Sequence, residues 1–205
     1  YRDKFKDKKS TNNDKYIGIT LHSEQKETPP LEKKFTDYYS KNFYLHQTYS
    51  KKEADKDKNK DDGDLTNIKT IRLFKEDIKK YKTFAHIVTA DGGFPWVDEN
   101  YQEQEAYRLL LGEILAAVTV QAKGGHFICK FFETFTIVSI KLFCILQSFY
   151  DEVYIHKPHM SRPSNSERYT VAKGFKYEQG KKLDDKIKIL ENLLDDFNKI
   201  EESGL

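Results

Sequence analysis

The sequence of 205 residues contains only two cysteines, Cys129 and Cys144. Two cysteines are too few for a disulfide framework, so we expect both to be reduced and buried. No run of about 18 apolar residues occurs, which excludes a transmembrane helix. The first residues do not resemble a signal peptide. These absences predict an intracellular protein of the nucleus or cytoplasm.

Common signatures of cofactor and metal binding are also absent. The chain has neither a Walker loop nor a G-x-G-x-x-G motif, and no cysteine–histidine spacing typical of a metal site. Its six histidines are scattered, and we expect His126 to be a packed core residue rather than a ligand. The net charge is only +2, so any contact with nucleic acid must come from a local patch. No metal site is predicted.

The charge that is present lies mostly in runs. Charged residues make up 33% of the chain and hydrophobic residues 38%, and the charge gathers at the two ends and in residues 51–64. Because lysine and acidic residues alternate in 51–64, their charges cancel locally, and we expect a solvated loop there. The length predicts one domain with a sizeable core.

Hydrophobic periodicity predicts strands that alternate with helices. Strands are expected at 16–21, 42–45, 85–90, 124–130, 152–156 and 169–173, and helices near 68–78, 102–121, 135–150 and 183–200. This alternation is typical of an α/β protein with a mostly parallel, doubly wound sheet and helices on both faces. An antiparallel hairpin is expected at the end of the chain.

Charged side chains stand at the ends of three predicted strands. Lys130 ends one strand, Asp91 directly follows another, and Glu167 comes two residues before a third. A lysine at the end of a buried strand is costly unless it has charged partners. Ligands of open α/β sheets bind just outside the carboxyl ends of the strands. We therefore expect these three side chains to form one site.

Three motifs resemble those of the cap-specific mRNA 2′-O-methyltransferases, which are FtsJ-like (RrmJ-type) enzymes. They are TADGGF at 89–94, GGHFICK at 124–130 and SRPSNSERY at 161–169. The segments YIGITL at 16–21 and DGDLT at 62–66 resemble the same family in the same order. The resemblance extends to about residue 175.

The resemblance implies a Rossmann-like methyltransferase fold that uses S-adenosylmethionine as its methyl donor. The FtsJ-like domain would occupy residues 1–175, N-terminally incomplete, with a C-terminal amphipathic helix in 176–205. The substrate would be the ribose of the first transcribed nucleotide of capped RNA. Other capping or transcription proteins are implied as further partners.

The family also implies roles for particular residues. Asp91, Lys130 and Glu167 match the last three members of its Lys-Asp-Lys-Glu tetrad. The implied cofactor-binding residues are Asp64, Leu65 and Asp91, and the implied substrate-binding residues are Asn100, Tyr101, Gln102, Arg162 and Asn165. The first lysine and the glycine-rich donor loop would precede Tyr1, so we expect the first strand to be missing and the chain alone to bind the donor weakly.

The chemistry explains these residue types. A ribose 2′-hydroxyl is a poor nucleophile, so a base must take its proton, and Lys130 can serve while Asp91 and Glu167 orient it and stabilise the ammonium. Two other functions stay open: methylation of ribosomal or transfer RNA, and a non-catalytic RNA-binding subunit with the same fold.

Overall fold

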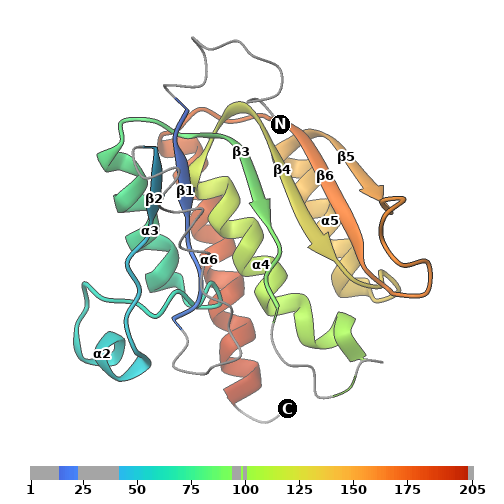
Figure 1. The fold of residues 1–205 in the computed structure, drawn as a ribbon, viewed down its shortest axis with the longest axis horizontal. Helices are drawn as coiled ribbons and strands as arrows, with labels where there is room; N and C mark the ends of the chain where they lie inside the picture. The colour runs from blue at the N-terminus through green and yellow to red at the C-terminus, as the bar shows by residue number, and fades with distance from the viewer. Residues whose placement is uncertain (1–13, 23–41, 94–97, 99–100, 203–205) are drawn as a thin grey trace. The chain divides into compact units, whose positions relative to one another are not determined.

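The computed structural model describes residues 14–22, 42–93, 98 and 101–202 (Figure 1). Contacts divide the chain into two compact units, Tyr1–Asp64 and Leu65–Leu205. None of the described helices has the length and hydropathy needed to cross a membrane.

The described residues of the first unit form two short strands and one short helix. Strand β1 (Tyr16–Gly18) pairs in parallel with β2 (Phe43–Leu45), and β1 is shorter than the predicted strand 16–21. Helix α2 (Lys51–Lys56) corrects the prediction of a loop over 51–64. Glu53 accepts hydrogen bonds from the backbone N–H of Ser50 at 3.3 Å and from its hydroxyl at 2.8 Å. These hydrogen bonds cap the start of the helix, so a helix forms here although the charges of the segment alternate in sign.

One acid of the same charged run is buried. Asp61 is 2% exposed, and its carboxylate lies 2.9 Å from Nε2 of His46. It also accepts a hydrogen bond from the backbone N–H of Gly63, which has a φ of +81°. A Cβ on Gly63 would lie 2.2 Å from the carbonyl oxygen of Thr20. The end of the charged run is therefore a packed turn and not a solvated loop.

The second unit is built on a four-stranded sheet. Its strands are β3 (Ala85–Ala90), β4 (Gln121–Phe131), β5 (Tyr150–His156) and β6 (Arg168–Phe175), in the order β3-β4-β6-β5. Strands β3 and β4 are parallel, whereas β6 is antiparallel to both β4 and β5. Three strands therefore run in one direction, and the antiparallel strand lies between two of them (Figure 1).

Four helices complete this unit. They are α3 (Ile68–Lys80), α4 (Gln102–Val120), α5 (Ile137–Phe149) and α6 (Lys181–Glu202). Helices α4 and α5 contact each other and pack on the same face of the sheet, and α4 also contacts α3 and α6 (Figure 1). The α/β fold predicted from the alternation of elements is confirmed.

The alternation of side chains along β4 separates the core from the opposite face of the sheet. Phe127, Cys129 and Phe131 are fully buried beneath α4 and α5. Since successive strand residues point to opposite faces, Lys130 and His126 lie on the other face. His126 is exposed, so the prediction of a packed core histidine is wrong.

The two cysteines differ in their surroundings. Both are free thiols, Cys129 is buried, and Cys144 is exposed on α5. The prediction of burial is therefore wrong for Cys144. Only one side of α5 is buried, through Ser139, Leu142, Leu146 and Phe149, and Cys144 is not on that side.

The glycines of the predicted strand 124–130 lie within β4 and not at its start. Gly124 has a φ of +76°, and the pairing register between β3 and β4 shifts nearby. A Cβ on Gly125 would lie 2.9 Å from the carbonyl oxygen of His86. The pair of glycines thus permits an irregularity and a close approach of β4 to β3.

Helix α6 packs onto α3 and α4 through one apolar side. Its buried residues are Leu183, Ile187, Leu190 and Leu194. The guanidinium of Arg72 on α3 donates to both carboxylate oxygens of Glu191, at 2.9 and 2.8 Å. The helix therefore contributes to the core of the second unit.

Candidate active site

Asp91 and Lys130 meet at the carboxyl ends of β3 and β4. The register places Ala90 opposite Cys129, so the residues that follow them are neighbours. The Nζ atom of Lys130 forms an ion pair with Oδ1 of Asp91. The lysine side chain is only 18% exposed, whereas that of Asp91 is 64% exposed. The charged partner expected for Lys130 is therefore present.

Tyr169 brings Glu167 into the same site. Because β6 is antiparallel to β4, Tyr169 lies directly opposite Lys130. Its hydroxyl donates a hydrogen bond to Oε1 of Glu167 at 2.9 Å. Burial, the hydrogen bond to Glu167 and the charges of Glu167 and Asp91 raise the pKa of Tyr169 to about 12. The hydroxyl therefore stays protonated at neutral pH and remains a donor.

Tyr169 was not among the predicted site residues, although the sequence carries a signal for it. Residues two apart in a strand share one face, so Glu167 at the start of a strand implies that Tyr169 lies beside it. The same alternation aligns Tyr169 with Lys130 on the face away from the core.

The loop before β6 is fixed by Lys157, another residue missed in the sequence. Its ammonium donates to the backbone carbonyls of Asn165 at 2.9 Å and Glu167 at 2.8 Å, and also to the side-chain oxygen of Asn165. The side chain of Asn165, predicted to bind substrate, is thus held close to the start of β6. No local pattern reveals this contact, because it joins the residue that follows β5 to a loop residue eight positions later.

Two of the predicted substrate-binding segments come together. The hydroxyl of Ser166 donates to Oε1 of Gln102, the first residue of α4, at 2.8 Å. Tyr101 is 56% exposed, and Arg162 is also exposed. Asn100 lies outside the described residues.

Asp64 and Leu65, two of the implied cofactor-binding residues, belong to different units. In the first unit, the backbone N–H of Asp64 donates to Oδ1 of Asp62 at 3.2 Å. In the second unit, Leu65 lies against α4, where a Cβ on Gly112 would stand 2.2 Å from the carbonyl oxygen of Leu65. The backbone of Leu65 is therefore fixed by the surface of α4.

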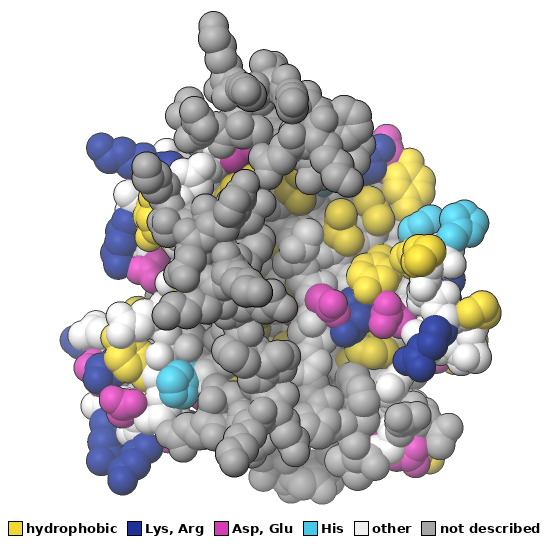
Figure 2. Space-filling model, in the orientation of Figure 1, with side chains coloured by type: hydrophobic (Ala, Val, Ile, Leu, Met, Phe, Trp, Pro, Cys, Tyr) yellow, Lys and Arg dark blue, Asp and Glu magenta, His cyan; other side chains and the backbone are white. Residues whose placement is uncertain are grey.

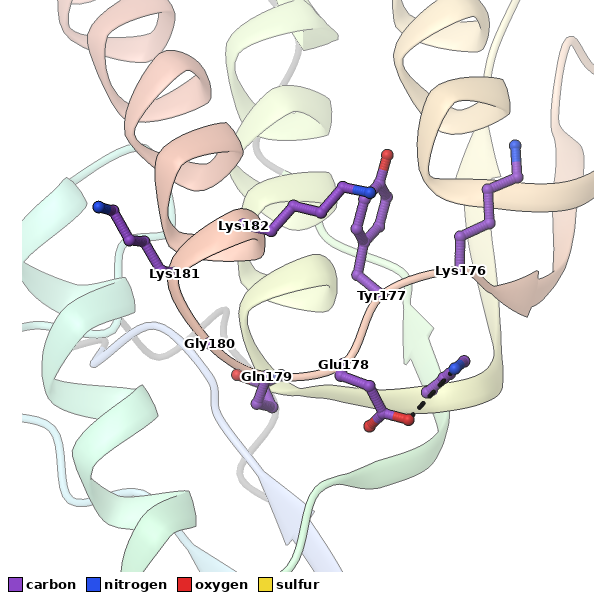
Figure 3. Close-up of a pocket in the computed structure, with 8 residues that line it drawn as sticks. Lys176, Tyr177, Glu178, Gln179, Gly180, Lys181 and Lys182 are labelled. Atoms are coloured by element: carbon purple, nitrogen blue, oxygen red, sulfur yellow. Dashed lines mark ion pairs between the residues drawn. The ribbon is translucent and has the colours of Figure 1, made fainter.

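A surface cleft lies at the other end of β4 (Figure 3). It is lined by Lys123 and residues 176–182, including Lys176, Lys181 and Lys182, and an ion pair of 3.3 Å joins Lys123 to Glu178. Lys123 precedes Lys130 by seven positions and lies on the other side of the irregularity at Gly124, and none of the residues that line the cleft belongs to the group around Lys130. This basic cleft is therefore separate from the candidate active site.

The candidate active site combines one lysine with two carboxylates and a tyrosine hydroxyl. Such a set can accept and return a proton at Lys130 and can attract a cation. Within the described ranges, no three His, Cys, Asp or Glu side chains gather as metal ligands. The side chains that are present can transfer a proton and stabilise charge.

Comparison with known proteins identifies relatives that are about 40% identical over most of the chain. The chain is 41% identical over 166 residues to cap-specific mRNA (nucleoside-2′-O-)-methyltransferase 1 of Homo sapiens. The aligned region covers 79% of the chain and 19% of the relative. The Bos taurus protein of the same name is 40% identical with the same coverage. The chain thus matches about a fifth of the length of these relatives.

A solved structure and a family model give the fold and the family. A crystal structure of a ribosomal RNA methyltransferase from Plasmodium falciparum superposes with a TM-score of 0.51 at 18% identity, covering 83% of this chain and 78% of that one. The model of the FtsJ-like methyltransferases matches residues 8–175. Since this match spans most of the sequence and includes Asp91, Lys130 and Glu167, the chain belongs to the FtsJ-like methyltransferase family.

Proposed function

We propose that this chain carries the catalytic residues of an RNA 2′-O-methyltransferase that acts on the first nucleotide of capped mRNA. The observation that carries the proposal is the ion pair between Lys130 and Asp91, with Tyr169 opposite Lys130 in the sheet and hydrogen-bonded to Glu167. The names of the relatives support capped mRNA as the substrate over ribosomal or transfer RNA. The free thiols of Cys129 and Cys144 support action in the nucleus or cytoplasm, where other capping or transcription proteins would be its partners.

The residues at the strand ends fit S-adenosylmethionine as the donor. The exposed carboxylate of Asp91 offers a negative charge to a sulfonium, and the fixed backbone of Leu65 offers a rigid edge to an adenosine. When bound, S-adenosylmethionine supplies the methyl group in a form that an oxygen nucleophile can take. We assign Asp64, Leu65 and Asp91 to its binding.

Lys130 would act as the base of the reaction. In its neutral form, Nζ accepts the proton of the ribose 2′-hydroxyl while that oxygen gains the methyl group. The carboxylate of Asp91 then stabilises the ammonium that forms, and the hydroxyl of Tyr169 keeps Glu167 beside it. Correct placement of the hydroxyl contributes further, since good orientation of reacting groups removes ~7 kcal/mol of a barrier.

The ribose would be presented by the loop before β6 and the start of α4. Lys157 holds Asn165 in place, and Ser166 ties the loop to Gln102. Tyr101 and Arg162 are exposed beside these residues in sequence, where a ring can stack on a base and a guanidinium can bind phosphate. We assign this group, together with Asn100, to RNA binding.

The direct test supplies the complete protein with labelled S-adenosylmethionine and three RNAs of one sequence. The first is capped, the second is uncapped, and the third is capped and already 2′-O-methylated on its first nucleotide. We expect label on the capped RNA alone. Equal labelling of the uncapped RNA would favour another RNA substrate, and binding without any transfer would indicate a non-catalytic subunit.

Replacing Asp91 with Asn should slow methyl transfer more than it weakens RNA binding. The change keeps the shape of the side chain but removes the charge that holds Lys130. A hydrogen bond between charged groups contributes ~1.5–3 kcal/mol, so we expect kcat to fall roughly 10- to 100-fold. Single-turnover rates and RNA affinity measured side by side give the comparison.

Asp195→Asn is the matched control, because Asp195 also pairs with a lysine, Lys199 at 2.7 Å, but on the outer surface of α6. The control should leave the rate unchanged. If RNA affinity falls as much as the rate in Asp91→Asn, then Asp91 binds RNA and has no role in the chemistry.

A further inference from the structure

Glu113 lies in the buried part of α4, where every residue from Leu110 to Val120 is buried. Its own exposure is only 3%. A carboxylate in such surroundings is costly unless hydrogen-bond donors compensate it. Its partners therefore show what the residue does.

Both partners of Glu113 stand next to residues of the candidate active site. Its Oε1 accepts a hydrogen bond from the backbone N–H of Gly92 at 2.7 Å, and Gly92 directly follows Asp91. Its Oε2 accepts from the thiol of Cys129 at 3.3 Å, and Cys129 directly precedes Lys130. One carboxylate therefore binds the ends of both β3 and β4.

We propose that Glu113 is a positioning residue, whose carboxylate joins the ends of β3 and β4 and thereby fixes how Asp91 and Lys130 meet. Its effect on the rate rests on the proposed methyltransferase function, whereas the link between the two strands does not. Cys129 points into the core and Lys130 to the opposite face, so Glu113 acts from behind the sheet.

The close approach of Glu113 to the backbone depends on a glycine. A Cβ on Gly92 would lie 2.6 Å from Oε1 of Glu113, which is closer than real Cβ contacts. Only glycine lets the N–H of residue 92 reach the carboxylate without moving it. The contact therefore requires both Gly92 and Glu113, although 21 positions separate them in the sequence.

The surroundings of Glu113 also set its protonation. Burial raises its pKa to about 7, and the charge of Asp91 adds to the rise, while the Gly92 N–H, the Cys129 thiol and the Lys130 ammonium oppose it. Asp91, Cys129 and Lys130 are the titratable groups that act on it from the ends of β3 and β4. The folded protein thus holds this proton more tightly than the unfolded chain, whose carboxyl has a pKa near 4.5.

This difference predicts the sign of a pH effect on stability. Between about pH 4.5 and 7 the folded state binds more protons at Glu113 than the unfolded state, so its contribution to stability falls as the pH rises through this window. The glutamine side chain of Glu113→Gln cannot titrate, so the variant should lack this contribution to the dependence of stability on pH.

Glu103 offers a matched control on the same helix. It is also buried, at 7% exposure, but it accepts hydrogen bonds from the start of α5: from the N–H of Thr136 at 2.8 Å and the hydroxyl of Ser139 at 2.6 Å. Burial raises its pKa, but the hydrogen bonds from Ser139, Thr136 and Phe135 together outweigh burial and lower it. The contribution of Glu103 to stability is therefore lost as the pH falls, whereas the contribution of Glu113 is lost as the pH rises.

The test compares Glu113→Asp, Glu113→Leu, Glu113→Gln and Glu103→Gln in the complete protein. Hydrogen-exchange mass spectrometry of the peptide that contains Gly92 reports the link itself. Single-turnover rates and the KM for capped RNA report its effect on the site. Stability measured from pH 4.5 to 7.5 reports the titration.

We expect Glu113→Asp and Glu113→Leu to expose the Gly92 amide, because one hydrogen bond to a charged acceptor is lost. The exchange rate of this amide should rise about tenfold, and kcat should fall about tenfold. The KM should stay within about twofold, since no residue that binds RNA changes. Glu113→Gln keeps an oxygen for the Gly92 N–H, so its rate and exchange should stay near those of the original protein.

Two results would overturn the proposal. One is an unchanged exchange rate of the Gly92 amide in Glu113→Asp, and the other is a loss of kcat in Glu103→Gln as large as the loss in Glu113→Asp. If Glu113→Leu does not fold, the Asp and Gln variants still decide. If the original protein transfers no methyl group, the proposed function fails, whereas the exchange of Gly92 still tests the link between the strands.

Discussion

Replacing Lys130 with Ala should reduce the single-turnover rate of methyl transfer by roughly 10²–10⁴-fold, the usual cost of losing a general base. The fold should survive, because the lysine head group is not part of the core and the ring of Phe132 remains buried beside it. Asp91 would lose its ion-pair partner but stays hydrated at 64% exposure. Thermal unfolding and the rate, measured on the same sample, separate the two effects.

Two further variants define what the loss means. Lys130→Arg should be nearly as inactive, because a guanidinium keeps its proton near neutral pH and cannot serve as a base. Lys173→Ala is the control: Lys173 lies on the same face of the sheet and pairs with Glu152 at 3.2 Å, but at the far end of β6. A rate above about a tenth of the original in Lys130→Ala is incompatible with a general-base role.

Gly112→Ala should destabilise the second unit, although alanine is the better helix former by ~1 kcal/mol. The new Cβ would stand 2.2 Å from the carbonyl oxygen and 2.8 Å from the carbonyl carbon of Leu65, which are backbone atoms and cannot rotate away. Overpacking of this kind costs about 1–3 kcal/mol. For a chain of this size, that corresponds to a fall in Tm of roughly 2–10 °C.

The same substitution should also weaken donor binding, since it displaces Leu65, a residue that we assign to the adenosine pocket. Gly93→Ala is the control for stability: a Cβ there meets nothing within 4 Å, so the Tm should hold or rise slightly. Calorimetric unfolding and titration with S-adenosylmethionine test both effects. A stability gain in Gly112→Ala would show that the contact between α4 and Leu65 is looser than described.

The sequence was sufficient to predict that Asp91 and Lys130 meet at the ends of neighbouring strands. The apolar run that ends at Lys130 and the strand before Asp91 both form as predicted, because local periodicity determines them. Parallel pairing of neighbouring strands then brings their carboxyl ends together. The helix predicted from Ile71, Phe74 and Ile78 is confirmed for the same reason, with all three residues buried.

The contacts that support the pair could not be predicted in this way. Glu113 stands alone among apolar residues of α4, which marks it as unusual, but its partner Gly92 is 21 positions away. His126 was misjudged because a strand was recognised without deciding which face is buried. The position of β6 between β4 and β5 depends on long-range pairing, which leaves no local trace in the sequence.

Insertion of β6 between β4 and β5 has a consequence for synthesis on the ribosome. Within the described sheet, β5 pairs only with β6, which follows it along the chain. Until residues 168–175 leave the exit tunnel, β5 has no strand partner and β4, which contains Lys130, keeps an open edge. This sheet is thus completed only after β6 has been synthesised, and a nascent chain that pauses before Arg168 exposes the unpaired β5 and one open edge of β4 to aggregation or to a chaperone.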